Sequence, residues 1–444
     1  MNAQFWTATA IFVAAYALII TEKVHKTVVA LCGASLVLLL GILSQREAFR
    51  SPELGVDWNV IFLLLSMMII VDLMKPSGVF EYIAIKSAKL GRGSPAGILV
   101  IFSLVTAVMS ALLDNITTVL LITPVTVLVA DSLEVDAMPF LISCALASNI
   151  GGTATLIGDP PNIMIASRAG LTFMDFLRNL APVIAVILVF YAAAVKLIWG
   201  RSLRTTDYLK ARVMAMDERG AIRDWPLLVK SLAVLGAVLA GFVLHDRLGL
   251  QPATVALSGA ALMLLMARKD APAGSLLAVE WSTLFFFIGL FIIVGGVVKV
   301  GLIEWMSVKA IAITRGNLLG TSMAVMWFSA LASAFIDNIP FVATMNPMIS
   351  GMARDLWPGL SGPQLLHQPG LMPVWWSLAL GACLGGNGTA IGASANVVVV
   401  GMAEGMGKKI SFGRFMLYGM PLMLMTVAIS ALYVWLRYFV FGMY

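Results

Sequence analysis

The fold of this 444-residue chain is decided by a short phrase that occurs twice, Asp114-Asn115-Ile116 and Asp337-Asn338-Ile339. The copies lie 223 residues apart, about half of the chain, and a proline stands ten residues after each aspartate. A second phrase also recurs, as GGTATLIG at 151–158 and as GGNGTAIG at 385–392. The chain therefore contains an internal duplication in which each half carries polar, glycine-rich segments.

The surroundings of these phrases are apolar. Hydrophobic residues make up 60% of the chain, charged residues make up 12%, and the mean hydropathy is +0.96. Soluble domains carry about 25% charged residues, so we predict an all-α polytopic membrane protein. The apolar runs are near-continuous and do not alternate, which excludes a transmembrane β-barrel. The net charge of +6 suits loops that face an anionic lipid bilayer and gives no indication of nucleic-acid binding.

Ten apolar stretches are near the ~20 residues that a bilayer requires. Five spans per half is an odd number, so the second half must enter the membrane upside down relative to the first. We predict two inverted repeats, 1–222 and 223–444. The predicted spans cover roughly 5–21, 27–44, 58–74, 137–170 and 180–199 in the first repeat, and 226–244, 252–267, 281–299, 374–406 and 415–441 in the second.

One span in each repeat is too long for a single straight helix. The stretches 137–170 and 374–406 contain the glycine-rich phrases, so we expect each to be a helix broken near the middle of the membrane. Glycine releases the backbone from the helix ladder and proline removes an N–H group. The freed backbone groups and half-helix ends are suited to binding ions and polar solutes. Glycine-mediated helix packing is the alternative explanation.

Two further regions, about 95–130 and 316–350, are apolar but carry the Asp-Asn pair in the middle. A carboxylate that faces lipid at the bilayer centre costs about 2.5–3.5 kcal/mol or more. We therefore predict a re-entrant helical hairpin in each repeat, with the Asp-Asn pair at its tip inside the protein. Full membrane spans are the alternative.

The hairpin-tip acids, Asp114 and Asp337, are candidates for binding a proton or another cation, because burial disfavours the charged form of a carboxylate. They could equally cap the second hairpin arm. Asp159 is a third proton-coupling candidate or a half-helix cap, and Ala393 stands at the matching place in the second repeat. The candidate substrate- and ion-binding residues are Asp114, Asn115, Thr117, Asn149, Gly151, Gly152, Thr153, Thr155, Asp159, Asn162, Asp337, Asn338, Asn387, Thr389 and Asn396.

The three cysteines, Cys32, Cys144 and Cys383, have no metal-ligand spacing, so we expect no structural metal and no cofactor. Free buried cysteine usually acts as a small apolar filler, and that is how we interpret Cys144 and Cys383. The coupling ion should be H⁺ or Na⁺.

These motifs resemble those of the ion transporter superfamily, specifically its arsenite-permease group, which also holds NhaD-type sodium/proton antiporters and the melanosomal P protein. The resemblance covers nearly the whole chain. It rests on the runs 114–118 (DNITT), 149–162 (NIGGTATLIGDPPN) and 337–341 (DNIPF). Sodium-coupled dicarboxylate carriers resemble the chain more distantly, because their hairpin tips carry Ser-Asn-Thr where this chain has acids. The resemblance implies inverted repeats, hairpins and movement of the motif-bearing part.

The leading hypothesis from sequence is a secondary active transporter that exports arsenite and antimonite, coupled to protons. A Na⁺/H⁺ antiporter is the main alternative. A cation-coupled anion carrier, a passive channel and an intramembrane enzyme have less support. A homodimer and a separate ATPase subunit are the partners that this hypothesis allows. The basic segment 200–225 predicts that this loop is cytoplasmic, which places both termini outside the inner membrane.

Overall fold

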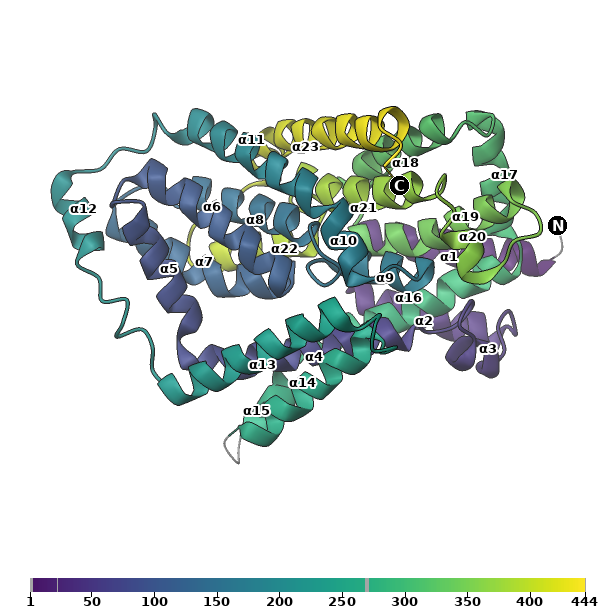
Figure 1. Ribbon diagram of the computed structural model, residues 1–444, viewed down its shortest axis with the longest axis horizontal. Coiled ribbons are helices and arrows are strands. Elements are labelled where there is room, and N and C mark those ends of the chain that lie inside the picture. The colour runs from purple at the N-terminus through teal and green to yellow at the C-terminus, as the bar shows by residue number, and fades with distance from the viewer. Residues whose placement is uncertain (1–2, 22, 268–270, 444) are drawn as a thin grey trace.

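The computed structural model describes residues 3–21, 23–267 and 271–443, and these ranges contain helices, turns and loops but no strand (Figure 1). Eight of the described helices are long and apolar enough to cross a membrane. Four shorter apolar helices accompany them. They are Lys26–Leu39, Met138–Gly152, Pro252–Met266 and Leu318–Ser333.

The helices of the first half follow the predicted spans closely, with one difference. The stretch predicted as a span over 27–44 ends as a helix at Leu39, because the chain turns at Gly41 (φ 67°) and Ser44 caps a new short helix. The elements are α1 (Ala3–Thr21), α2 (Lys26–Leu39), α3 (Gln45–Arg50), α4 (Trp58–Met74), α5 (Val79–Leu90), α6 (Pro95–Leu112), α7 (Asn115–Ser132), α8 (Met138–Gly152), α9 (Pro160–Ala169), α10 (Phe173–Asn179), α11 (Ala181–Trp199) and α12 (Asp207–Met214).

The second half contains a similar succession of helices. Its last helix, α23, continues into a π-helical turn over Trp435–Val440. The elements are α13 (Trp225–Leu244), α14 (Pro252–Met266), α15 (Ala271–Ala278), α16 (Trp281–Lys299), α17 (Leu302–Thr314), α18 (Leu318–Ser333), α19 (Asn338–Leu356), α20 (Gly362–Leu366), α21 (Met372–Gly385), α22 (Ser394–Gly405) and α23 (Phe412–Val434).

Both long apolar stretches are broken where the sequence predicts. The first runs as α8 and α9 with a non-helical segment between them, and Pro160 and Pro161 occupy the first turn of α9. Proline is tolerated there because the N–H groups of the first turn have no partner within the helix. The second runs as α21 and α22, separated by a short 3₁₀ turn at Gly386–Gly388 and a loop.

Each of the two Asp-Asn regions contains a pair of helices joined at the Asp-Asn pair, α6–α7 and α18–α19. Both helices of the first pair are long and apolar enough to cross a membrane, so a re-entrant path for these hairpins stays a prediction. Asp114 caps α7 by accepting a hydrogen bond from the Thr117 backbone N–H at 2.7 Å. Asp337 caps α19 by accepting one from the Ile339 N–H at 3.2 Å. The capping interpretation of both acids is therefore confirmed, and it leaves the remaining oxygen lone pairs of both carboxylates available to other partners.

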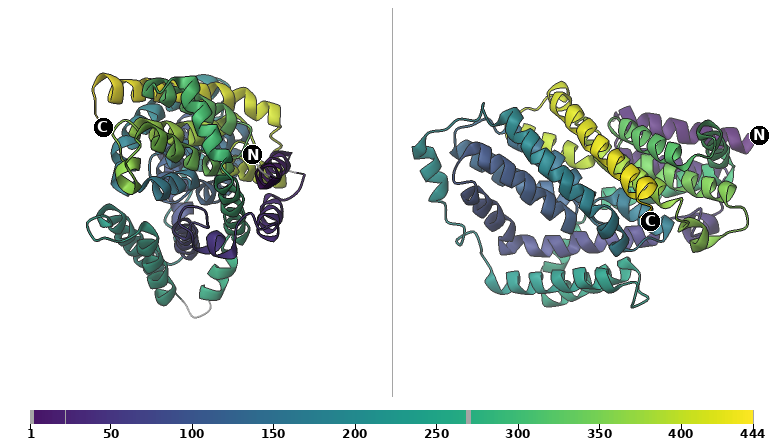
Figure 2. Two further views of the ribbon diagram at one scale, coloured as in Figure 1. Left: turned by 90° about the vertical axis from the view of Figure 1, so that its right-hand side faces the viewer. Right: turned by 45° about the horizontal axis from the view of Figure 1, so that its top comes forward.

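The hairpins and the broken helices pack crosswise into one core. The first arm of each hairpin packs against a broken helix from its own half, α6 against α8 and α18 against α21. The half-helices α9 and α22 instead pack against the second hairpin arm of the opposite half, α19 and α7 respectively. Helices α11 and α23 lie along one edge of this core, and α4, α13 and α14 lie along the other (Figure 1, Figure 2).

Close packing of hairpin and broken helix depends on glycine. A Cβ atom at Gly151 would lie 2.0 Å from the Ala107 carbonyl oxygen of α6. A Cβ at Gly385 would lie 2.6 Å from the backbone of Ala330 in α18. Helix packing thus explains why these two positions lack side chains, whether or not the glycines also approach a solute.

We expect Gly151→Ala and Gly385→Ala each to destabilise the protein by about 1–3 kcal/mol, because a methyl group would push rigid backbone apart. Gly401→Ala is the matched control, since Gly401 lies inside α22 with no atom near its missing Cβ. That substitution should be neutral or stabilising by up to about 1 kcal/mol. Thermal unfolding in detergent measures all three, and equal midpoints would contradict the packing argument.

Candidate functional site

The two broken helices meet through side-chain amides. Asn149 of α8 donates from Nδ2 to Asn387 Oδ1 at 2.9 Å and to Asn396 Oδ1 at 3.0 Å. Asn387 in turn donates to the Leu146 carbonyl of α8 at 3.2 Å. All three asparagines are fully buried or nearly so. The polar, broken segments of the two halves are therefore one continuous hydrogen-bonded cluster.

Cys383 belongs to this cluster, which the sequence interpretation as an apolar filler did not anticipate. Its Sγ lies 3.5 Å from Asn162 Oδ1. Alignment of the duplicated phrases places Cys383 opposite Asn149, since each stands two residues before a Gly-Gly pair. The contact between Cys383 and Asn162 is thus the counterpart of the contact between Asn149 and Asn396, and this alignment is the signal that could have located the thiol.

Two asparagines hold the broken segments in shape. Asn162 donates from Nδ2 to the carbonyls of Thr155 at 2.9 Å and of Gly152 and Thr153 at 3.3 Å. Asn396 donates to Gly386 at 2.8 Å and Thr389 at 2.9 Å. Carbonyls released by the helix breaks are therefore occupied by protein amides.

Threonine hydroxyls of the broken segments form hydrogen bonds with the hairpins. Thr155 Oγ1 donates to the Ala111 carbonyl at 2.6 Å, and Thr389 Oγ1 donates to the Ala334 carbonyl. Thr153 Oγ1 donates within its own segment, to the Asn149 carbonyl at 2.7 Å. A direct role of these hydroxyls in binding a solute stays a prediction, because the structure shows each of them engaged with backbone.

Asp159 lies where the two hairpin tips converge. Its side chain is 0% exposed. Asn115 Nδ2 donates to Oδ1 of this carboxylate at 3.1 Å, and Asn338 Nδ2 donates to Oδ2 at 3.3 Å. Asp159 stands at the cap position of α9 but makes no side-chain capping hydrogen bond. The cap role that the sequence left open is therefore not observed for Asp159, and its role in proton coupling stays a prediction.

The tip of the first hairpin retains one unused acceptor. Asn115 also donates to Asn149 Oδ1 at 3.3 Å, but its own Oδ1 is buried and has no hydrogen-bond partner among the residues that the structure describes. A buried acceptor without a partner costs about 1–3 kcal/mol. Thr117 contributes its backbone N–H to the cap of Asp114, as described above. An open oxygen next to Asp159 is the arrangement expected of a site that receives a further ligand.

Asp337 has a partner that the sequence reasoning missed. Lys26 is the first residue of α2, and its Nζ lies 2.8 Å from Asp337 Oδ2. Ser394, at the start of α22, donates to the same oxygen at 2.9 Å. Because 311 residues separate Lys26 from Asp337, no local pattern could pair them.

Comparison with known proteins agrees with this architecture. The profile of the CitMHS family, described as citrate transporter, matches residues 16–381. An uncharacterized transporter of Mycobacterium tuberculosis is 48% identical over 433 residues, which cover 98% of each chain. A 46 kDa membrane protein of Mycobacterium leprae is 44% identical with similar coverage.

A mammalian relative and a solved structure extend the comparison. The P protein of Homo sapiens is 33% identical across the whole of this chain, which spans 61% of the human protein. The crystal structure of the Alcanivorax borkumensis YdaH transporter matches with a TM-score of 0.56 at 14% identity, covering 100% of this chain and 99% of that one. The latter match shows likeness of fold alone. The chain therefore belongs to the CitMHS family of the ion transporter superfamily, and it is a multi-pass secondary membrane transporter and not an enzyme.

Proposed function

We propose that this protein is a proton-coupled transporter in which Asp159 is the group that takes up and releases the coupling proton. The observation that carries the proposal is the isolation of this carboxylate. Within residues 3–21, 23–267 and 271–443, no Lys, Arg or His nitrogen forms an ion pair with Asp159. A fully buried, unpaired carboxylate is very costly when ionised, so binding of a proton or another cation is needed to balance it.

The other two acids are better balanced without a proton. Asp114 accepts a backbone N–H at the start of α7, where the helix dipole also favours negative charge. Asp337 has both a helix-capping bond and the Lys26 ammonium. Asp159 accepts hydrogen bonds from the neutral side chains of Asn115 and Asn338 and lies next to the Cys383 thiol, but within the described residues it has no ion pair. Among the three proton-coupling candidates, Asp159 is therefore the one whose charge depends most on a mobile ion.

Asp159 also occupies the right place to couple movement to ion binding. Its two amide partners, Asn115 and Asn338, come from the tips of different hairpins. A change in the charge of Asp159 therefore changes the strength of both hydrogen bonds. A neutral carboxylic acid accepts hydrogen bonds from amides less strongly than a carboxylate does. Proton uptake should thus loosen the contact between tips and broken helix, and proton release should restore it.

We further propose that the halves 1–222 and 223–444 are inverted repeats. Matching hydrogen bonds support this arrangement. Ser110 Oγ donates to the Ser148 carbonyl at 2.7 Å, and its counterpart Ser333 donates to the Ala382 carbonyl at 2.6 Å. The contacts of Thr155 and Thr389 with Ala111 and Ala334 form a second matching pair. Two such halves around a shared polar centre are the usual basis of alternating access in secondary transporters.

For the cargo, we propose a small uncharged oxyacid such as arsenous or antimonous acid. The central cluster offers amide donors and acceptors, an open Asn115 oxygen and one thiol, Cys383, which suits a hydroxyl-bearing, thiophilic solute. Citrate carries three carboxylates, and at this centre it would face the Asp159 carboxylate, which forms no ion pair with a basic side chain within the described residues. Arg50, Arg168 and Arg354 line a separate cavity of about 560 Å³.

Sodium/proton exchange is the second candidate. It is favoured by the convergence of the Asp159 carboxylate and the unpartnered Asn115 oxygen, because hard cations prefer carboxylate and amide oxygens. In this case Na⁺ and H⁺ would compete for Asp159, and no organic or oxyacid cargo would be required.

Asp159→Asn should reduce proton-coupled transport to the level of protein-free vesicles, because the amide keeps the shape but cannot bind a proton reversibly. The measurement is proton flux in proteoliposomes, followed with a pH-sensitive dye after cargo addition. Asp131→Asn is the matched control, since Asp131 forms only an exposed pair with Lys408 and should leave flux unchanged. Full activity of Asp159→Asn would overturn the proposal.

The cargo is tested in the same vesicles under an imposed pH gradient. Arsenite uptake into inside-acid vesicles should exceed that in vesicles without a gradient, and Cys383→Ser should lower it about tenfold if the thiol contacts the cargo, which is a loss of about 1.4 kcal/mol of binding. Proton release on adding Na⁺ alone would favour the antiporter. Gradient-dependent uptake of citrate alone would exclude both cargo proposals while leaving the role of Asp159 to its own test.

A further inference from the structure

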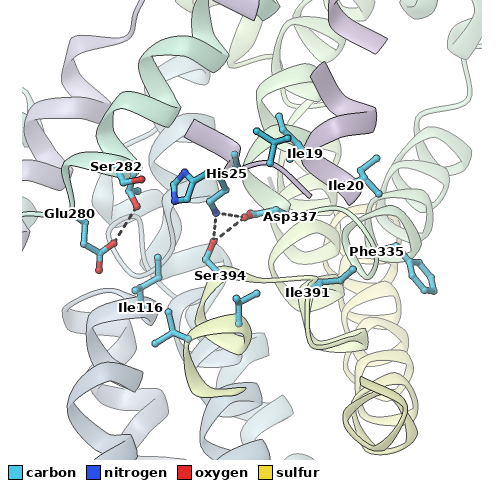
Figure 3. A pocket seen from close by; sticks show the side chains of 15 residues that line it. Ile19, Ile20, His25, Ile116, Glu280, Ser282, Phe335, Asp337, Ile391 and Ser394 are labelled. Atoms are coloured by element: carbon cyan, nitrogen blue, oxygen red, sulfur yellow. Dashed lines mark hydrogen bonds and ion pairs between the residues drawn. The ribbon is translucent and has the colours of Figure 1, made fainter. Parts of the chain in front are cut away.

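A cavity of about 340 Å³ opens beside the tip of the second hairpin. Figure 3 shows Asp337 and Ser394 on one side of this cavity and Glu280 and Ser282 of the α16 start on the other. Ile116, next to Asn115 in the first hairpin tip, also lines it. The cavity therefore lies between Asp337 at the tip of the second hairpin and Ile116 at the tip of the first.

The Lys26 ammonium occupies the Asp337 side of this cavity. Besides its contact with Asp337, Nζ donates to Ser394 Oγ at 3.0 Å, and it lies 5.1 Å from the centre of the Phe286 ring. Cation–π contacts of this length are attractive. The ammonium group of Lys26 in α2 thus contacts two elements that are distant in sequence, the α18–α19 tip and the start of α22.

A lysine at this position is unfavourable on local grounds. Lys26 is the first residue of α2, where the helix dipole and the free N–H groups repel a cation. Its side chain is also one-third exposed, so it could reach solvent. The contacts with Asp337, Ser394 and Phe286 are therefore what hold the ammonium in the cavity.

The surroundings of Nζ have the composition of a monovalent-cation site. A carboxylate oxygen and a hydroxyl oxygen lie within hydrogen-bond distance, at the capped end of α19 and the start of a half-helix. His25 and Glu280 line the same cavity and are the other titratable groups that face it. The first hairpin has no such arrangement, because the position that matches Lys26 in the 223-residue register is Gly249 and Asp114 has no described ion pair.

We propose that Asp337 forms a site for a monovalent cation and that the Lys26 ammonium fills it as a tethered cation. This deepens, and rests on, the proposed function: because the protein itself neutralises Asp337, no mobile cation is needed there, and Asp159 remains the group proposed to bind the coupling proton. The negative charge of Asp337 is then balanced by Lys26 throughout the transport cycle. Lys26 acts as a specificity-determining residue that keeps Na⁺ and K⁺ away from Asp337.

The proposal is tested by asking whether removal of the tether creates a cation site. Purified Lys26→Met should gain thermal stability on going from N-methyl-D-glucamine chloride to NaCl at constant ionic strength. The expected gain over the wild type is about 1–2 °C for each tenfold rise in Na⁺ above the dissociation constant. Lys23→Met removes an exposed lysine three residues earlier and should respond as the wild type does.

Two double variants locate the new site. The gain should vanish in Lys26→Met/Asp337→Asn and persist in Lys26→Met/Asp159→Asn. Lys26→Gln, which keeps a hydrogen-bonding amide, gives the same readout should Lys26→Met yield no folded protein. The absence of any gain over the wild type, or a gain that survives loss of Asp337, would overturn the proposal. A gain that requires Asp159 would also overturn it, while leaving the proposed function standing, because that function is tested separately by proton flux.

Discussion

The structure depends on one constraint, namely that backbone groups released by a helix break in apolar surroundings must find partners inside the protein. Asn162 and Asn396 meet this requirement by donating to the carbonyls of the two breaks. Thr155 and Thr389 then fasten the same segments to the hairpins. Because these four side chains donate hydrogen bonds to backbone carbonyls, the protein itself fixes the conformation of the two helix breaks. Nearer the hairpin tips, Asn115 Oδ1 is a buried acceptor without a hydrogen-bond partner among the described residues.

This division of labour accounts for how far the sequence could predict the site. Glycine, proline and asparagine in both halves mark the breaks, and the Asp-Asn pairs mark the hairpin tips, because these features are local and recur. The assignment of each polar residue could not be predicted, since Asn162 and Asn149 look alike in sequence. One braces the backbone of its own break, while the other joins the two halves. Only their partners in space distinguish the two roles.

Contacts between segments that are distant in the sequence are the other reason why the structure differs from the sequence-based prediction. Lys26 lies within a short charged stretch between two apolar runs, and nothing in that stretch indicates a distant partner. Its partner is Asp337, in the other half of the chain. Similarly, Cys383 has an ordinary apolar neighbourhood in sequence but contacts Asn162 in space. The duplication itself held information on the cysteine, because its matching position is Asn149, whereas no register relates Lys26 to Asp337.

The departures from symmetry matter more for function than the symmetry does. Two identical halves would present two equivalent acids, at the tips or at the breaks, and a mobile ion would have no preferred site. Here Asp159 is matched by Ala393, so the second break contributes no charge. At the tips, Asp337 is paired with a lysine while Asp114 is held by its own helix. Among the described residues, Asp159 is then the fully buried acid that has neither a helix-capping hydrogen bond nor an ion pair. In the proposed function, the coupling ion therefore binds between the tips of both hairpins, because Asn115 and Asn338 both donate to this carboxylate.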